Sequence, residues 1–371
     1  MKISLKRTPE QDELIKAMAS RNRQTAYEAQ TALAEFIGPI LAEVVNTAPT
    51  ISNLFTQLQF NADDNPSIPL DLYYDITDED YITVWSQSAP GGLPQNQVLP
   101  TVSEMKVTTY TLDSALSFDR RYAAKSRMDV VSKTFTRMAQ EILGKQERTS
   151  TNLLMSALAT ATTNSLDHLV SATTAGTFLL NDFNTLITRA RRINTSYNKG
   201  TPVGGASRGV TDLLISPELE NAIRTMAYNP INTKGAGGSS LANDARSNGI
   251  AAPDEMRMAI YKSAGLPEFY GVSLTVLNEL GKGQKYNTIF DTVYSAAGGT
   301  FDGSTQEVAV ALDRGRDSLV RVTAVDGDSG SEFSLTADDQ FSIRQGKIGY
   351  FGQLEEGRVC LDNRGILGVI V

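Results

Sequence analysis

Residues 126–161, SRMDVVSKTFTRMAQEILGKQERTSTNLLMSALATA, decide how the rest of this sequence is interpreted. The stripe Val131, Phe135, Met138 and Ile142 has steps of four, three and four residues, the period of a helix with one apolar face. A polar middle follows, and then the stripe resumes; the residues are Gln146, Arg148 and Thr149, then Leu153, Leu154, Ala157 and Leu158. Ser126 with Asp129 three positions later is a helix-start signal of the capping-box kind.

The predicted helix is unusually long. At 1.5 Å per residue it extends for about 50 Å, far more than an average globular helix. Gly144 lies inside it and costs roughly 1 kcal/mol relative to alanine, which need not break it. Such a helix suits the core of an ordinary enzyme or the spine of an elongated protein. The extended hairpin predicted before it favours the spine.

Length and composition limit the classes of protein. The 371 residues allow one large domain or two to three smaller ones, and 41% hydrophobic with 20% charged residues predicts a sizeable core. The 34 basic and 42 acidic residues give a net charge of −8. This charge argues against specific nucleic-acid binding, because phosphate contacts need clustered Lys and Arg. It leaves open a wall that encloses nucleic acid.

Cellular location follows from what the sequence lacks. Cys360 is the only cysteine, so no intrachain disulfide can form. No apolar run approaches the ~20 residues that cross a bilayer, and the N-terminus has no apolar signal region. We expect a soluble protein made in a reducing cytoplasm.

The segments before the long helix look like an arm and a hairpin. Thr8 and Pro9 begin one predicted helix, and residues 26–46 form a second that Pro39 interrupts. Strand patterns and turn residues then alternate; they are Leu70–Ile76, Tyr81–Trp85, the loop Ser86–Pro100 and the strand Val107–Phe118. Because an isolated hairpin is marginal in water, we expect it to lie on a neighbouring subunit.

Beyond Ser171 the pattern is α/β. Asn181 or Asp182 caps one helix, and Ser216-Pro217-Glu218 begins another after the strand Asp212–Ile215. Further elements are predicted as a helix at Pro253–Ala264 and strands at Val272–Leu277, Val308–Leu312 and Leu319–Val325. Residues 332–371 return to short strands, with turns at Gly346, Glu356-Gly357 and Asn363.

Catalytic chemistry finds little support. A serine or cysteine hydrolase usually needs a histidine base, and His168 is the only histidine. We interpret it as a surface or packing residue and Cys360, on a predicted strand, as a buried structural thiol. A zinc site would need more Cys and His ligands than the chain has. We therefore predict no catalytic, cofactor-binding or metal-binding residues.

Four weaker patterns could be functional sites, but each also has an ordinary structural explanation as a turn or a solvated surface. Asp326-Gly327-Asp328 lacks the spacing of a calcium loop and predicts a turn, and Gly281-Lys282-Gly283 lacks that of a phosphate loop. An acidic cluster could be a metal site or a solvated hairpin base; it is Asp75, Asp78, Glu79 and Asp80. A basic run could pair with it across a subunit contact or be solvated; it is Arg120, Arg121, Lys125 and Arg127.

The order of these pieces carries a resemblance. Three local sequences support it: SPELENAIRTM after DLLIS, GLPEFYGVSLTVLNEL at 265–280, and the closing FSIRQGKIGYFGQLEEGRVCLDNRGILGVIV. Together they resemble the tailed-bacteriophage major capsid protein of the Hong Kong 97 type over most of the chain. Gly271 matches that family's Gly-x-Pro-Val region, whereas Ser273 and Leu274 replace its Pro-Val pair.

The resemblance implies an α+β fold with named parts. Residues 1–60 would be the N-terminal arm and 61–112 the E-loop hairpin. Residues 113–170 would form the peripheral domain with its spine helix, 171–331 the axial domain, and 332–371 a return to the peripheral domain.

The resemblance also implies a structural protein that is not an enzyme. Copies would form hexamers and pentamers of an icosahedral shell around double-stranded phage DNA, without sequence-specific binding, in a virion assembled in the host cytoplasm. Expected partners are the chain itself, portal and scaffold proteins and decoration proteins, with no membrane; the start at Met1 favours a separate scaffold. Alternatives are an encapsulin-like nanocompartment shell, or an α/β enzyme. Some family members form Lys–Asn cross-links, but the hairpin tip SQSAPGGLPQNQVLP has no lysine, so we expect none.

Overall fold

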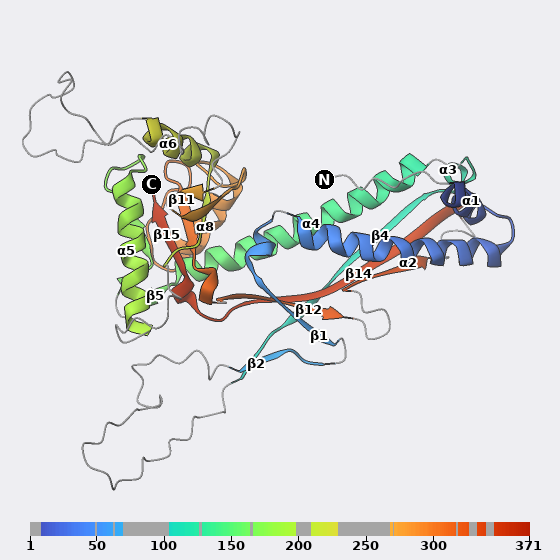
Figure 1. The fold of residues 1–371 in the computed structure, drawn as a ribbon, viewed down its shortest axis with the longest axis horizontal. Coiled ribbons are helices and arrows are strands. Elements are labelled where there is room, and N and C mark those ends of the chain that lie inside the picture. Colours follow the sequence, from blue (N-terminus) through green and yellow to red (C-terminus); the bar gives the residue numbers. More distant parts are fainter. Residues whose placement is uncertain are drawn as a thin grey trace, which may run out of the picture. The chain divides into compact units, whose positions relative to one another are not determined.

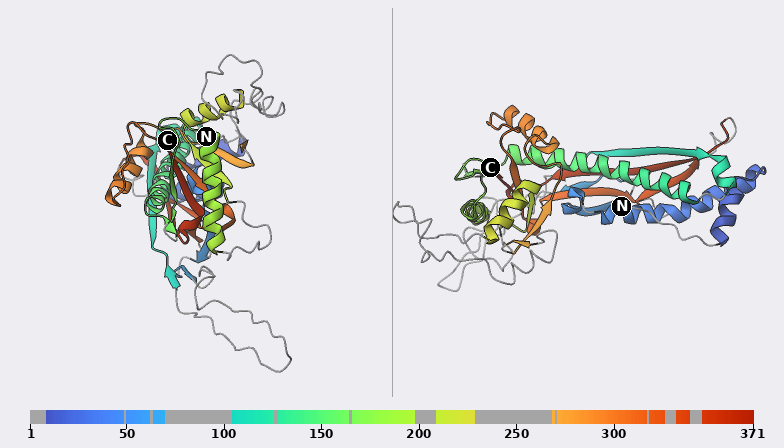
Figure 2. Two further views of the ribbon diagram at one scale, coloured as in Figure 1. Left: turned by 90° about the vertical axis from the view of Figure 1, so that its left-hand side faces the viewer. Right: turned by 90° about the horizontal axis from the view of Figure 1, so that it is seen from above.

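The computed structural model describes residues 9–48, 50–61, 64–69, 104–125, 128–163, 166–197, 209–228, 268–269, 271–316, 318–325, 332–338 and 345–371. Two compact units share the chain (Figures 1 and 2). The first contains residues 1–70, 102–153 and 319–359, and the second contains 71–101, 154–318 and 360–371. Each unit is described by itself.

The first unit consists of helices packed on a sheet. Its helical elements are α1 (Pro9–Met18), α2 (Arg23–Thr47), the 3-10 turn η1 (Ile51–Leu54), α3 (Arg120–Ala124) and most of α4 (Met128–Ala159). Its strands are β1 (Thr56–Asn61), β2 (Ser67–Pro69), β3 (Glu104–Lys106), β4 (Thr109–Asp119), β12 (Leu319–Val325), β13 (Phe333–Asp338) and nearly all of β14 (Lys347–Cys360).

Helix α4 confirms the predicted spine. It has 32 residues, and Gly144 does not interrupt it. The first half of the predicted stripe is buried, with Val131 and Phe135 fully so. In the second half Leu154 and Leu158 are fully buried, whereas Leu153 is only half-buried, which corrects its predicted place in the core. Ser126, the predicted cap, lies outside the described residues.

The sheet under α4 is built around β14. Strand β4 pairs antiparallel with β14 from Asp119↔Lys347 to Thr109↔Gly357, and β13 pairs antiparallel with it as well. The order is β1-β12-β14-β13, with β1 parallel to β12. The prediction of a turn at Glu356-Gly357 is wrong, because both residues lie inside β14. Glycine is needed at position 357 for close packing and not for a turn, because a Cβ there would come within 2.8 Å of the Thr108 carbonyl oxygen.

One apolar core joins the helices to this sheet. Tyr350 of β14 is fully buried; its ring meets Phe135 of α4 edge-on at 5.4 Å between centroids and stacks with Phe118 of β4 at 6.2 Å. Gly352 follows two residues later on the same face, where a Cβ would overlap Met138 and Phe333. Helix α2 packs on β13, and Figure 1 shows α2 and α4 running along the strands.

Proline 39 does not interrupt the second helix, contrary to the prediction. It lies inside the continuous helix α2. A proline removes the hydrogen bond to the carbonyl four residues earlier, here that of Glu35. Glu35 and Pro39 are both on the exposed side of α2, where water can satisfy that carbonyl.

The second unit is a mixed sheet with helices. Its helical elements are α5 (Leu180–Tyr197), α6 (Pro217–Tyr228), α8 (Lys285–Ala296) and the 3-10 turns η3 (Arg314–Arg316) and η4 (Asn363–Gly365). Its strands are β5 (Thr162–Thr163), β6 (Leu166–Asp167), β7 (Leu169–Ser171), β8 (Asp212–Ile215), β9 (Glu268–Phe269), β10 (Val272–Val276), β11 (Val308–Leu312) and β15 (Ile366–Ile370). The main sheet has the order β7-β15-β11-β8-β10-β9.

The helix starts of this unit follow local sequence. The Ser216 hydroxyl accepts a hydrogen bond from the Leu219 amide at 3.1 Å, as predicted for the cap of α6. Asp182 does not occupy the cap position of α5, since the helix starts at Leu180. Its carboxylate instead reaches back to the Leu179 amide at 2.8 Å and also accepts from the Thr173 amide and hydroxyl. This is the returning half of a capping box.

Other predicted strands are present, and several predicted segments are not described. Strands β4, β8, β10, β11 and β12 match the predicted ranges within one or two residues. The predicted strands Leu70–Ile76 and Tyr81–Trp85, the loop Ser86–Pro100, the helix Pro253–Ala264 and the turn Asp326–Asp328 lie outside the described residues.

The two compact units cut across the predicted five segments. Strand β12 lies in the sheet of the first unit, although its residues were predicted as axial. The last strand, β15, pairs with β11 and β7 in the second unit, although 332–371 was expected to return to the peripheral domain. The division into arm, E-loop, peripheral and axial parts remains a proposal.

Candidate functional site

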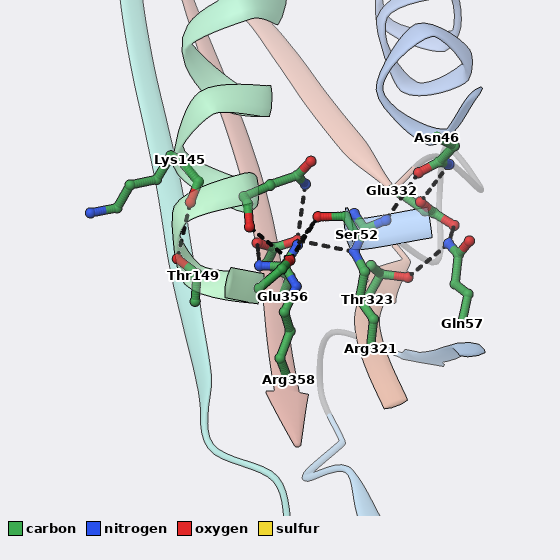
Figure 3. A network of polar contacts seen from close by, with 12 residues as sticks. Asn46, Ser52, Gln57, Lys145, Thr149, Arg321, Thr323, Glu332, Glu356 and Arg358 are labelled. Carbon is green, nitrogen blue, oxygen red and sulfur yellow. Dashed lines mark hydrogen bonds and ion pairs between the residues drawn. The ribbon is translucent and has the colours of Figure 1, made fainter. Parts of the chain in front are cut away.

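The most connected polar group of the first unit is a buried carboxylate, Glu356 of β14. Its side chain is fully buried and accepts hydrogen bonds from four side chains (Figure 3). Oε1 accepts from the Tyr110 hydroxyl and from Arg358, both at 2.8 Å. Oε2 accepts from Gln146 at 2.9 Å, from Arg321 at 3.1 Å and from Arg358 at 3.2 Å.

Regular structure brings these donors together. Tyr110 lies directly opposite Glu356 in the β4–β14 ladder. Arg358 is two residues further along β14, so both side chains leave the same face of the strand. Gln146 comes from the polar middle of α4 and is buried, which explains why the apolar stripe is interrupted there. Arg321, in the middle of β12, completes the group.

The group carries more positive than negative charge. Two guanidinium groups, each with a side chain at most 4% exposed, surround one carboxylate. Arg358 Nε and one terminal nitrogen of Arg321 have no hydrogen-bond partner among the described residues. Removing one partner of a buried ion pair costs more than the pair itself contributes, because the other charge is left uncompensated.

A second, more exposed layer extends the network. Arg321 donates to Asn46 of α2 at 3.3 Å, and Asn46 donates to Glu332 at 3.0 Å. Glu332 also accepts from Gln57 and Gln59 of β1. These links tie β1, β12, α2 and the start of β13 to one another (Figure 3).

Ser52 of η1 joins the network to the spine helix. Its hydroxyl lies 2.9 Å from the Ser150 hydroxyl of α4, and Arg358 donates to it at 3.1 Å. The neighbouring amide of Ile51 donates to Glu147 of α4 at 2.9 Å. The segment that follows α2 is therefore fastened to α4 by hydrogen bonds.

The electrostatics suit a structural role. Burial raises the pKa of Tyr110 to about 12, so its hydroxyl remains a hydrogen-bond donor at neutral pH. Burial also lowers the pKa of Arg358, and Glu356 opposes that effect. The cluster contains one carboxylate, whose two oxygens already accept hydrogen bonds, and two guanidinium cations. It can hold helices and strands in register.

Sequence reasoning missed this group. One signal was present: Arg321 lies inside the apolar run LVRVTAV, and a charge at such a place needs a buried partner. The partner could not be identified because Glu356 is 35 residues away and had been interpreted as part of a turn.

His168 and Cys360, the two residues considered for catalysis, both lie in environments that suit packing. His168 is fully buried in the second unit, and its Nδ1 lies 2.8 Å from the Ile366 carbonyl oxygen. Burial lowers the pKa of His168, so this packing histidine is neutral at physiological pH. Cys360 is a half-buried free thiol at the end of β14, and burial raises its pKa to about 12. A thiol with such a pKa is a poor nucleophile.

The weaker patterns are only partly described. Gly281 and Gly283 have positive φ angles of 135° and 70° in the turn before α8. Arg120, Arg121 and Lys125 lie in or beside α3, whereas Arg127 and the acidic cluster at 75–80 are outside the described residues. Within the described ranges, no three His, Cys, Asp or Glu side chains gather as metal ligands would. The helices in those ranges include none with the length and apolar content to cross a membrane.

Comparisons with known proteins bear on the fold. No family model matches the sequence, and no curated protein matches it. The structure is similar to the capsid protein of a native GTA particle, with a TM-score of 0.50 and 12% identity over 88% of this chain and 90% of that one. It is also similar to the capsid of cyanophage P-SCSP1u (TM-score 0.48, 11% identity, 87% and 88% covered). A third similar structure is an encapsulin of Synechococcus elongatus (TM-score 0.44, 12% identity, 85% and 85% covered).

The fold assignment rests on the first of these similarities. It extends over nearly the whole of both chains. The chain therefore has the α+β fold of Hong Kong 97-type capsid proteins.

Proposed function

We propose that this chain is the major capsid protein of a tailed bacteriophage. Copies assemble into hexamers and pentamers of an icosahedral shell that encloses double-stranded DNA without reading its sequence. The single observation that carries the proposal is the similarity of fold to a capsid protein over 88% of the chain. The protein works as a wall and catalyses no reaction.

The structure of each unit is consistent with this role. The first unit, with α4 on its sheet, serves as the peripheral domain, and the second serves as the axial domain, whose loops meet at the centre of a capsomer. Residues 61–112 act as an E-loop between neighbours, and residues 1–60 act as an arm whose helices α1 and α2 also pack in the core of their own first unit. Buried polar groups such as Glu356 hold the first unit rigid, which a repeated building block needs.

The proposed partners follow from the proposed shell. The chain binds other copies of itself, a portal, a scaffold and decoration proteins. Its location is the virion, after assembly in the host cytoplasm.

Assembly tests the proposal. A compact monomer of this length has a radius of gyration of ~21 Å. We expect sedimentation and electron microscopy to show capsomers or closed particles, alone or with co-expressed head proteins. A compact monomer under every such condition would contradict the proposal. Particles filled with a co-purifying enzyme in place of DNA would point to a nanocompartment shell.

A further inference from the structure

One side of α4 exposes four cations. Between residues 131 and 153 the exposed side chains of this helix include Lys133, Arg137, Lys145 and Arg148, and a single carboxylate, Glu141. At 3.6 residues per turn these five positions fall within about a third of the helix circumference. We call the four cations the basic stripe. None of them forms an ion pair with another residue that the structure describes, and Figure 3 shows Lys145 pointing away from the buried network.

The stripe has the length and spacing to follow a charged polymer. Lys133 and Arg137 are four residues apart, so they are separated by about 6 Å along the helix axis. From Lys133 to Arg148 the stripe is about 22 Å long. A DNA duplex has one phosphate charge per about 1.7 Å of its axis, so a duplex lying along α4 can bring a phosphate to each cation.

Gly144 leaves the helix backbone bare in the middle of the stripe. Glycine destabilises the interior of a helix relative to alanine. No atom lies within 4 Å of the position that a Cβ would take at Gly144, so packing among the described residues does not require glycine there. A bare backbone beside Lys145 lets a bulky group such as a phosphate approach the helix closely.

The other long helix of this unit has the opposite charge. Helix α2 contains no lysine or arginine from Gln24 to Thr47, and its exposed residues include Glu28, Glu35 and Glu43. Charges of both signs are thus sorted between two helices and are not mixed on each. On a chain of net charge −8, the positive face of α4 is therefore a local surface that attracts a negative partner.

The residues around the stripe favour DNA over a protein as that partner. Protein interfaces are enriched in aromatic residues, and among the described residues no large exposed hydrophobic side chain is on α4, whereas Tyr27 and Phe36 of α2 are exposed. The exposed neighbours of the cations are instead polar, namely Gln140 and Asn152. Polar, strongly positive surfaces are typical of DNA contacts, and these side chains are among those that bind phosphates.

We propose that double-stranded DNA lies along the basic stripe of α4, bound through its phosphates and without reading of its bases. The inference rests on the proposed shell and deepens it, because it names the surface of the chain that touches the enclosed duplex. Four cations contact at most four phosphates, so a single copy binds weakly. Many copies in one shell bind the same duplex together, and their weak contacts add up.

DNA titration tests the contact directly. The full chain, kept unassembled as checked by sedimentation, is titrated at low salt into a short labelled duplex and followed by fluorescence anisotropy. The stripe variant replaces all four cations; it is Lys133→Gln/Arg137→Gln/Lys145→Gln/Arg148→Gln. The matched control removes four exposed cations from other segments of the first unit; it is Lys16→Gln/Arg21→Gln/Lys125→Gln/Lys347→Gln.

We expect the stripe variant to bind at least ten times more weakly than the unmodified chain, and the control to bind within threefold of it. For four phosphate contacts, the logarithm of the binding constant should fall against the logarithm of the salt concentration with a slope of about −3.6. Each half of the stripe variant, Lys133→Gln/Arg137→Gln or Lys145→Gln/Arg148→Gln, should remove about half of that slope. These halves decide the question if the fourfold variant does not fold.

Three results of the titration would overturn the proposal. The first is equal binding by the stripe variant and the unmodified chain, or an equal loss in the stripe variant and the control. The second is a tenfold preference for one of two unrelated duplex sequences, because phosphate contacts carry no sequence information. The third is a polyglutamate peptide that binds the stripe more tightly than the duplex, which would assign this face to an acidic protein segment.

Assembled particles separate this inference from the proposed function. Particles formed with DNA duplexes present are treated with nuclease, and the DNA that they retain is measured. The stripe variant should form particles in normal yield that retain less DNA than those of the unmodified chain. If both retain the same amount, the inference fails and the proposed shell stands. If the unmodified chain forms no particles, the proposed function fails, and the titration still decides the contact.

Discussion

Glu356 is the residue on which the buried network of the first unit depends. Replacing it by glutamine leaves Arg321 and Arg358 buried without a counter-charge. We expect Glu356→Gln to lower the free energy of unfolding by roughly 3–5 kcal/mol, measured by denaturant unfolding. Glu141→Gln, an exposed change on α4, is the control and should stay within about 0.5 kcal/mol. Equal effects of the two changes would show that the network contributes little.

His168 gives the second unit a pH dependence. Burial lowers its pKa from the ordinary value of 6.5, so the unfolded chain binds this proton more readily than the folded one. Stability from the neutral ring is complete above pH 6.5 and is lost as the pH falls through and below that value. Because the chain has one histidine, His168→Gln should flatten the change in unfolding midpoint between pH 7.5 and 5.5. The same slope in both proteins would assign it to other groups.

Single residues were predictable where chemistry is local. Ser216 as a helix cap follows from its neighbours in the sequence and agrees with the structure. Cys360 was predicted as a buried structural thiol on a strand; it lies at the end of β14 and is half-buried. The Glu356 network was not predictable, because its members come from four elements that only the folded sheet brings together. A lone charge in an apolar strand signals that a partner exists without identifying it.

Among the elements, the spine helix α4 has the clearest energetic expectation. Phe135 is fully buried against Tyr350, so Phe135→Ala should lower the free energy of unfolding by roughly 3–5 kcal/mol. Leu153→Ala on the same helix is half-buried and should cost less than half as much. Denaturant unfolding measures both. A change below about 1 kcal/mol for Phe135→Ala would mean that the stripe is not the core of this unit.

Element type was predictable, and element pairing was not. The 3.6-residue period of α4 and the two-residue period of β4 can be recognised within one short stretch of sequence, so both elements were predicted nearly to their bounds. Strand neighbours are chosen by the whole fold. β15 joins β11, more than 50 residues earlier, and this placed the last strand in a unit that the sequence did not indicate. Pro39 shows the same limit, because its tolerance depends on which side of α2 meets water.

At the scale of the whole molecule, the E-loop should act between subunits. Shortening Pro90–Gln97 to a Gly-Gly turn removes the predicted tip and leaves both predicted strands. We expect a subunit that unfolds at the same temperature as the unmodified chain but no longer closes stable shells, because the tip contacts a neighbour and adds little to its own fold. Calorimetry and electron microscopy measure the two properties. Normal shells from this variant would rule out an intersubunit role for the tip.

Covalent cross-linking is the last property of the assembled molecule that the sequence addresses. A Lys–Asn isopeptide bond needs a lysine held against an asparagine of a neighbour, with a carboxylate as base, because the amine reacts only in near-attack geometry and with a lowered pKa. The predicted hairpin tip has no lysine; Lys106 is exposed at the end of β3, and Asn363 is half-buried in η4. We therefore expect shells held by non-covalent contacts alone. Boiled, denatured particles should migrate as one band near the monomer mass of 40.1 kDa, and a ladder of multiples would refute this.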